Sequence, residues 1–341
     1  MSTGPTDPQP HRLPLRLHGA LGSPYSMKLR ALMRYRRIPH LWVQDHAART
    51  ALFERVKAPV IPLLEHPDGR VTNDSTLLTR ELEASHPGRS VLHDEAGHAF
   101  LGFLIEDFAD EWLTKAMFGW RWLAEADQQQ MSRWLMFDNM AGAGAAAQEA
   151  MARAFRDRQV GRMPLVGCTA DNFPLIETSA RAVLAALEAN VSENLFLFGT
   201  RPSEAEFALF GQLSQLAVDP TPQAVLRQDY PLACRWLAHI DDLSGLDEGR
   251  WGPPGPMVKP ILRVIGAVYL PFLVANAAAV ETGAAELRFE AMGLGFAQPP
   301  FRYQAKCLTA LRAAFRACEA DCAGPILGLL AETNCLEPLK G

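Results

Sequence analysis

The chain has 341 residues, enough for two or three domains of ordinary size. Its composition, with 48 % hydrophobic and 21 % charged residues, is that of a globular protein and excludes a disordered or fibrous one. The net charge of −5 and the absence of a concentrated basic stripe leave no electrostatic footprint for nucleic acid or an anionic membrane. We therefore expect a small molecule or another protein as the partner.

The first 93 residues alternate between strand and helix signals. An Asp68-Gly69 pair between two short apolar runs is a strong hairpin signal, and Asp74 or Ser75 suits the N-cap of the helix that follows. The order β-α-β-α-β-β-α predicts a small α/β domain over residues 13–93. Its expected elements are a strand at 13–18, a helix at 24–37, a strand at 39–46, a helix at 47–56, two strands within 58–73 and a helix from 74 onward.

Strand signals almost vanish after residue 96, and apolar residues recur at helical spacing. The Pro- and Gly-rich stretch 251–256 is a linker before a last helical block. We expect an all-helical domain over residues 97–245 and a helical extension over residues 246–341. The helical segments are predicted at 97–123, 128–158, 174–190, 203–218, 231–242, 257–282 and 304–322.

The termini and cysteines indicate the cell compartment. Residues 1–12 are polar and Pro-rich, which predicts a disordered tail without the apolar core of a signal peptide, so we expect a cytoplasmic protein. The six cysteines show no C-x-x-C pair, although Cys318 and Cys322 are spaced to face each other on a helix. The apolar run 264–280 is short for a membrane span, and we interpret it as a buried helix.

Two charged clusters have simple interpretations. We expect a solvated face from the basic residues of the first helix, which are Lys28, Arg30, Arg34, Arg36 and Arg37. An acidic run lacks a histidine at ligand spacing, so we expect a solvated or domain-facing role and no metal site for Glu106, Asp107, Asp110 and Glu111.

Residues 22–40 raise the question of chemistry, because their helix opens with Ser-Pro-Tyr-Ser. Pro24 suits the first helical position, which makes Ser23 the N-cap, and capping alone explains a serine there. Downstream, the proline of Ile61–Pro62 lies at a strand entry, where a cis bond would turn the backbone of residue 61 outward. Asp74–Ser75 begins a helix whose N-terminus can bind an anion. We expect these three elements to line one end of the small sheet.

These stretches resemble the glutathione transferase family, whose N-terminal domain is thioredoxin-like. The resemblance covers about residues 13–245, and the remaining residues have no counterpart in the common two-domain members. It implies an α+β thioredoxin-like N-terminal domain, an all-α glutathione transferase C-terminal domain and a helical extension. The matching segments are "SPYSMKLRALM", "VIPLL", "NDST" and "FLFGTRPSEAEFALFGQL", the last with a capping box at Ser203 and Glu206.

The family resemblance implies glutathione as co-substrate. Ser23 matches the catalytic Ser or Cys of the Ser- and Cys-type classes, with Tyr25 as the alternative hydroxyl. Ile61, beside Pro62, would pair with the cysteinyl backbone of glutathione. Asp74 and Ser75 would hold its γ-glutamyl end.

The glycyl end of glutathione departs from the family pattern. Val60 stands where the family commonly has a polar side chain, and His46, Arg49 or Lys57 can reach the glycyl carboxylate instead. Val60 and the long extension favour an alternative function, a catalytically silent protein that uses the fold for protein interaction.

The resemblance also implies a pocket for a small apolar electrophile between the two domains. We expect Trp112 and Phe108, in the aromatic-rich first helices of the helical domain, to lie near that pocket. A homodimer is implied as well, unless the extension covers the dimer surface and keeps the chain monomeric.

The energy needed from Ser23 is modest. A free thiol has a pKa of about 8.5, and lowering it by about two units requires roughly 2.7 kcal/mol. A hydroxyl hydrogen bond to a charged acceptor supplies about 1.5–3 kcal/mol, and a helix N-terminus adds about 0.3–1 kcal/mol. A serine therefore suffices to stabilise a thiolate, whereas it cannot form the mixed disulfide that a dithiol oxidoreductase needs.

Overall fold

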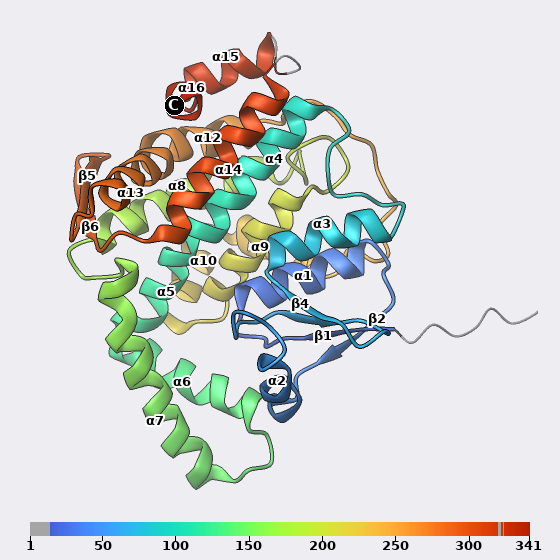
Figure 1. The fold of residues 1–341 in the computed structure, drawn as a ribbon, viewed down its shortest axis with the longest axis vertical. Helices are drawn as coiled ribbons and strands as arrows, with labels where there is room; N and C mark the ends of the chain where they lie inside the picture. Colours follow the sequence, from blue (N-terminus) through green and yellow to red (C-terminus); the bar gives the residue numbers. More distant parts are fainter. Residues whose placement is uncertain (1–13, 320–321, 323) are drawn as a thin grey trace, which may run out of the picture.

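The computed structural model describes residues 14–319, 322 and 324–341, so the predicted tail at residues 1–12 lies outside the described part. The first elements are β1 (Leu15–His18), α1 (Pro24–Tyr35), β2 (His40–Val43), α2 (His46–Phe53), β3 (Leu63–Glu65), β4 (Val71–Asn73) and α3 (Ser75–Ser85). They form a four-stranded sheet in the order β2-β1-β3-β4, in which β1 is parallel to β2 and antiparallel to β3. Helices α1 and α3 cover one face and α2 the other (Figure 1). This is the predicted thioredoxin-like arrangement.

A helical bundle follows the sheet. It comprises α4 (Ala96–Phe108), the π-helix η1 (Ala109–Leu113), α5 (Thr114–Leu123), α6 (Glu125–Asn139), α7 (Ala145–Arg162), the 3₁₀-helix η2 (Met163–Val166), α8 (Phe173–Asn190), α9 (Glu204–Leu216), α10 (Pro220–Asp229) and α11 (Pro231–Ile240). Helix α9 begins with the predicted capping box, in which the backbone N–H of Ser203 donates to Glu206 at 2.7 Å. It is buried along almost its whole length because α1 packs on one side of it and α4 on another.

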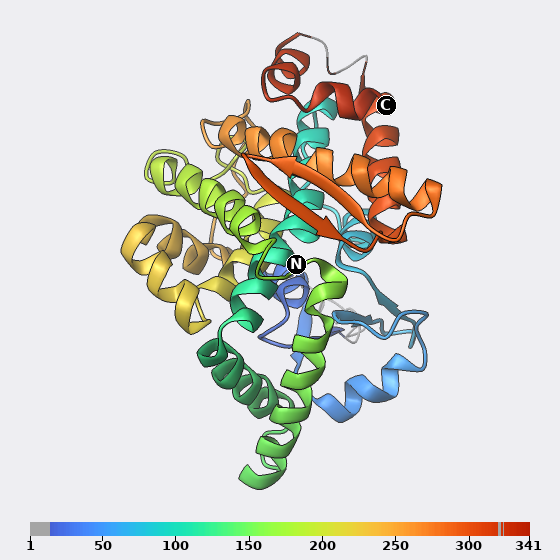
Figure 2. The same cartoon turned by 90° about the vertical axis from the view of Figure 1, so that its left-hand side faces the viewer.

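The extension is part of the same hydrophobic core and is not entirely helical. It comprises α12 (Val258–Val264), η3 (Ile265–Tyr269), α13 (Leu270–Thr282), β5 (Leu287–Ala291), β6 (Leu294–Gln298), α14 (Arg302–Cys318), α15 (Pro325–Glu332) and α16 (Leu336–Lys340). The β5–β6 hairpin, drawn in orange in Figure 2, corrects the prediction of helices alone. Its turn places Met292 and Gly293 at positive φ, of 53° and 75°. Two such residues make the turn that matches strand twist, although methionine is not its usual signal.

One helix in the described part, Val258–Thr282, is long and apolar enough to cross a membrane. However, 61 % of its most apolar window is buried inside the molecule, as expected of a core helix. The helix is therefore weak evidence for a membrane span.

The basic residues of α1 do not form the solvated face expected from the sequence. Lys28, Arg30 and Arg36 are all buried. Lys28 donates to Glu106 and to Asp110, and these bonds join α1 to the helical bundle. In the acidic run, Glu106, Asp107 and Asp110 are buried and Glu111 is partly exposed, so the domain-facing role is what the structure shows. Burial alone would lower the pKa of Lys28, but the two carboxylates outweigh that effect and raise it.

Candidate functional site

The register of the strands places the three predicted site elements at one end of the sheet. His18, the last residue of β1, pairs with Leu63 at the start of β3, and Leu63 pairs with Asn73 at the end of β4. After His18 the chain continues to Ser23. Residues 61–62 directly precede Leu63, and residue 74 directly follows Asn73. Because all three pass the same row of paired residues, they share one end of the sheet.

Ser23 is the N-cap of α1, as predicted. Its backbone is extended, with φ −103°, and Pro24 occupies the first helical position. The Ser23 hydroxyl accepts a hydrogen bond from the backbone N–H of Ser26 at 3.3 Å. A hydroxyl has one proton to donate besides its acceptor sites, so capping leaves that proton free for a ligand.

Tyr25 is turned towards the helical bundle. Its hydroxyl lies 2.9 Å from the carbonyl oxygen of Asp110 and 3.3 Å from the hydroxyl of Thr114. Burial, followed by the charges of Glu111 and Asp110, raises the pKa of Tyr25 well above its usual value. Its phenol proton is thus used to hold α1 against η1, and a role in binding glutathione stays a prediction.

The Ile61–Pro62 peptide bond is cis. Among the described residues, neither the N–H nor the carbonyl oxygen of Ile61 forms a backbone hydrogen bond. A backbone with both groups unpaired can pair with another peptide. The neighbouring Val60 is 52 % exposed.

Asp74 has an unusual backbone, with φ 81°, and caps α3. One carboxylate oxygen, Oδ1, accepts from the N–H groups of Thr76 and Leu77, at 3.1 and 3.3 Å. The other, Oδ2, has no hydrogen bond within the described part of the chain. Non-glycine residues at positive φ are uncommon and cluster at binding sites. Ser75, the first helical residue, is buried behind it.

The extension reaches this end of the sheet, which the sequence did not reveal. Tyr303 lies in the first turn of α14 and is 46 % exposed. Burial and then the charges of Asp74 and Glu111 raise the pKa of Tyr303, so its hydroxyl lies within electrostatic reach of both carboxylates.

The candidates for the glycyl carboxylate of glutathione are not equivalent. Arg49 is buried, and its guanidinium donates to the carbonyl oxygen of Gly19 and to the side chain of Asn139. Both bonds turn it into the protein and away from a ligand. His46 and Lys57 are exposed.

The prediction that Trp112 and Phe108 lie near the pocket for an apolar electrophile is wrong. Both are fully buried, and Trp112 donates its indole N–H to the hydroxyl of Ser179 at 2.9 Å. Phe272, from the extension, packs against the Trp112 ring at 5.2 Å between centroids. The two residues belong to the core because the extension covers the face that we expected to be open.

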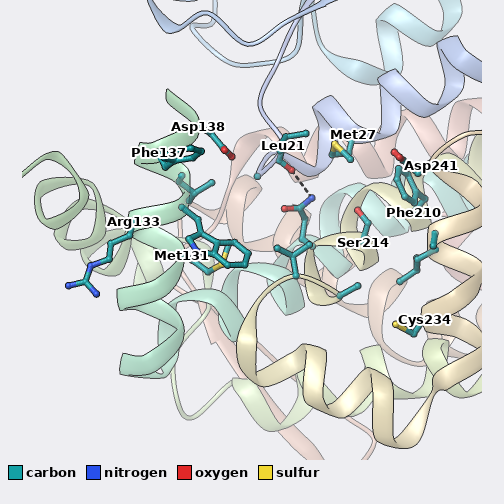
Figure 3. Close-up of a pocket in the computed structure, with 18 of the residues that line it drawn as sticks. Leu21, Met27, Met131, Arg133, Phe137, Asp138, Phe210, Ser214, Cys234 and Asp241 are labelled. Atoms are coloured by element: carbon teal, nitrogen blue, oxygen red, sulfur yellow. Dashed lines mark hydrogen bonds between the residues drawn. The ribbon is translucent and has the colours of Figure 1, made fainter. Parts of the chain in front are cut away.

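An apolar cavity of about 960 Å³ lies elsewhere, beside the residues that precede Ser23. Leu21 and Gly22 form part of its wall, as do Trp134 and Phe137 of α6. Figure 3 labels Leu21 and Phe137 among the lining residues. None of the six predicted site residues lines it. Its remaining wall comes mainly from α9 and α11 and includes Phe210, Ser214, Gln215, Val218, Cys234 and Leu237.

Sequence reasoning also missed the residues that support Ser23 from behind. Arg121 of α5 donates to the carbonyl oxygen of Gly22 at 2.9 Å, and Gln215 of α9 donates to that of Leu21 at 3.1 Å. Arg121 is paired with the fully buried Asp219. A charged residue within the otherwise apolar stretch 117–123 was the available signal.

Comparison with protein families agrees with this architecture. The model of the glutathione S-transferase N-terminal domain matches residues 17–90, which include all six predicted site residues. The model of the glutathione S-transferase C-terminal domain matches residues 145–239. A thioredoxin-like sheet followed by a helical bundle, with both family models in the matching order, defines the class of protein. The chain belongs to the glutathione S-transferase family.

Solved structures give weaker similarity. The glutathione S-transferase of Methylobacterium radiotolerans, in complex with glutathione sulfonate, is 17 % identical, with 71 % of this chain and 98 % of that chain covered and a TM-score of 0.42. The beta-etherase LigF of Sphingobium is 20 % identical, with 67 % and 95 % covered and a TM-score of 0.45. FzlA of C. crescentus is 18 % identical, with 73 % and 92 % covered and a TM-score of 0.40. No curated protein matches the chain.

Proposed function

We propose that this protein binds glutathione at the sheet end described above and that Ser23 stabilises the glutathione thiolate for attack on a small apolar electrophile. The observation that carries the proposal is the shared row of His18, Leu63 and Asn73, which gathers a helix N-cap, an unpaired backbone and an acidic cap. Each suits one part of a γ-glutamyl tripeptide.

The parts of glutathione are assigned by their chemistry. The unpaired N–H and carbonyl of Ile61 suit the cysteinyl backbone, and the free Oδ2 of Asp74 suits the γ-glutamyl ammonium group. The Ser23 hydroxyl then donates a hydrogen bond to the cysteinyl sulfur. Because Ser23 stands at the N-terminus of α1, the helix dipole favours the negative sulfur at this position.

We assign the electrophile to the apolar cavity beside Leu21 and Gly22, since Gly22 is the residue directly before Ser23. Aromatic and aliphatic walls favour an uncharged, apolar molecule. The thiol proton would pass to solvent, and the thiolate would form a bond to the electrophilic carbon as the bond from that carbon to the leaving group breaks. With chlorodinitrobenzene the leaving group is chloride, which departs to solvent with the bonding electron pair.

Calorimetry with glutathione tests binding. The proposal expects saturable binding to the wild-type chain and an ultraviolet thiolate band that is larger for bound than for free glutathione at the same pH. The exposed Val60 and the inward Arg49 leave the glycyl end with few partners. Absence of binding would therefore support the alternative, a catalytically silent protein of this fold.

Ser23→Ala tests the role of the hydroxyl. We expect a loss of about 1 kcal/mol in the free energy of unfolding, as for other lost caps, and a much larger drop in the rate of glutathione conjugation to chlorodinitrobenzene. Ser26→Ala is the matched control, because the Ser26 hydroxyl is in the same helix, fully buried and without a partner in the described structure. Equal turnover by the two variants would remove Ser23 from the mechanism.

A cytoplasmic location and a homodimer are part of the same proposal, since both are common in the family. Light scattering of the purified chain tests whether it is a homodimer. A mass of one chain would indicate that the extension has replaced the dimer contact.

A further inference from the structure

The loop of residues 19–22, between β1 and Ser23, has every carbonyl oxygen engaged. This is unusual for a loop, whose carbonyls commonly face water. The donors come from three separate helices and from the backbone of Ser23. They are the guanidinium of Arg49 to Gly19, the N–H of Ser23 to Ala20 at 3.1 Å, the amide of Gln215 to Leu21 at 3.1 Å and the guanidinium of Arg121 to Gly22 at 2.9 Å.

The donors at Leu21 and Gly22 belong to one buried unit. Arg121 binds both carboxylate oxygens of Asp219, at 2.7 and 2.9 Å, and donates to the side-chain oxygen of Gln215 at 2.8 Å. Arg121, Gln215 and Asp219 are 3 %, 2 % and 0 % exposed. A guanidinium held by two bonds to one carboxylate has a fixed plane, so its remaining N–H groups have fixed directions.

Hydrogen bonds are needed to hold this loop because packing against it is incomplete on one side. Leu21, Gly22 and Gln215 line the cavity of about 960 Å³, where Leu135 is the side chain that packs against Gly22. Figure 3 shows Leu21 at the cavity edge with its hydrogen bond as a dashed line.

We propose that Arg121, Asp219 and Gln215 form a positioning unit that sets the location of the Ser23 hydroxyl through the loop backbone. A peptide group is planar, so fixing the carbonyl of Gly22 also fixes the N–H of Ser23. That N–H is then held by Ala20, and the Ser23 side chain is placed before any ligand binds. None of the three residues reacts, and the inference rests on the proposed function.

Gln215→Met tests the unit without leaving a buried charge unpaired, because Arg121 keeps Asp219. Gln212→Met is the matched control. Gln212 lies one turn earlier on α9 and is 1 % exposed, and its side chain interacts with Asp110 and not with the loop. Arg121→Lys is a second test, because it keeps the charge beside Asp219 but cannot serve three acceptors in one plane.

Two measurements separate positioning from simple destabilisation. Amide hydrogen exchange of residues 20–26 in the ligand-free protein should be faster in Gln215→Met than in Gln212→Met. The kcat/KM for glutathione should fall roughly five- to tenfold, as for one lost hydrogen bond, and the thiolate fraction of bound glutathione at neutral pH should fall with it. Arg121→Lys should shift both readouts in the same direction.

Each result decides one point. Equal exchange in Gln215→Met and Gln212→Met overturns the inference, whatever glutathione does. Faster exchange with an unchanged thiolate fraction and unchanged kcat/KM also overturns it, because the loop would then not place Ser23 for chemistry. If the wild-type chain does not bind glutathione, the proposed function fails, while the exchange experiment still reports whether the unit holds the loop.

Discussion

At the scale of single residues, Asp74 lets glutathione binding and folding be tested separately, because its two carboxylate oxygens have different roles. Its Oδ1 caps α3 and its Oδ2 is free in the described structure. An asparagine at this position would keep an oxygen for the cap, and asparagine tolerates a positive φ. We therefore expect Asp74→Asn to leave the melting temperature nearly unchanged and to weaken glutathione binding roughly 10- to 100-fold, because a charge-assisted hydrogen bond is lost.

Calorimetry and thermal melting of Asp74→Asn give the two readouts. Asp68→Asn is a suitable control, because Asp68 is an exposed acid in the turn between β3 and β4, at the other end of these strands from the candidate site. If Asp74→Asn binds glutathione as tightly as this control, Asp74 has only a capping role.

Local residue signals predicted some of the candidate site and could not predict the rest. The caps at Ser23 and Asp74 follow from side chains that satisfy N–H groups two or three residues away, so a short stretch contains all the information. Arg121 and Asp219 are 98 residues apart, and their pairing with the loop depends on how α5, α9 and α1 cross. An apolar helix with one arginine indicates a buried partner but not its identity.

At the scale of elements, the crossing of α1 and α9 depends on Gly211. A Cβ atom there would lie 2.7 Å from the carbonyl oxygen of Pro24 and 3.0 Å from the Cβ of Lys28. Since backbone cannot move aside as a flexible side chain can, Gly211→Ala should force α1 away from α9. We expect a loss of about 1–3 kcal/mol in the free energy of unfolding, together with weaker glutathione binding, because Ser23 caps the displaced helix.

Denaturant unfolding and calorimetry measure both effects of Gly211→Ala. Gly102→Ala is the matched control, because Gly102 is also a buried helical glycine but its nearest neighbours would lie 4.0 Å from the new Cβ. The control should gain up to about 1 kcal/mol from helix propensity. Similar gains in both variants would show that the α1–α9 contact has room to relax.

Local signals within each helix or strand explain which elements could be predicted from the sequence. The seven elements of residues 13–93 combine strong caps, an Asp68-Gly69 turn and clear changes of period, and all are present. The predicted segment 128–158 divides into α6 and α7, where Gly142 and Gly144 adopt positive φ. Hairpin β5–β6 was missed because Met292 stands where asparagine or glycine is the usual signal, and because one strand pair in a helical context has little pattern of its own.

At the scale of the whole molecule, two acids of the helical bundle form hydrogen bonds with the extension. Asp107 accepts a hydrogen bond from Tyr269 at 2.5 Å, and Glu111 accepts one from Gln304 of α14 at 3.4 Å. Burial and then the neighbouring carboxylates Glu106 and Asp110 raise the pKa of Asp107 to about 7. Burial and then Asp107 and Asp110 raise the pKa of Glu111 to about 8, against the opposite effect of Lys115. Both acids join the extension to the helical bundle, and both keep their protons to a higher pH than ordinary carboxyl groups do.

These shifts predict how stability depends on pH. In the unfolded chain both groups lose their protons near pH 4, whereas the folded protein keeps them up to about pH 7 for Asp107 and pH 8 for Glu111. The folded state thus binds more protons between these values, and the contribution of the two acids to stability falls as pH rises from about 4 to 8.

Glu111→Gln, which keeps an oxygen for Gln304, should lessen this fall. Urea unfolding at a series of pH values compares it with Glu290→Gln, an exposed control on β5. Parallel pH curves for the wild type, Glu111→Gln and the control would show that Glu111 is ionised at neutral pH and that the extension is held in another way.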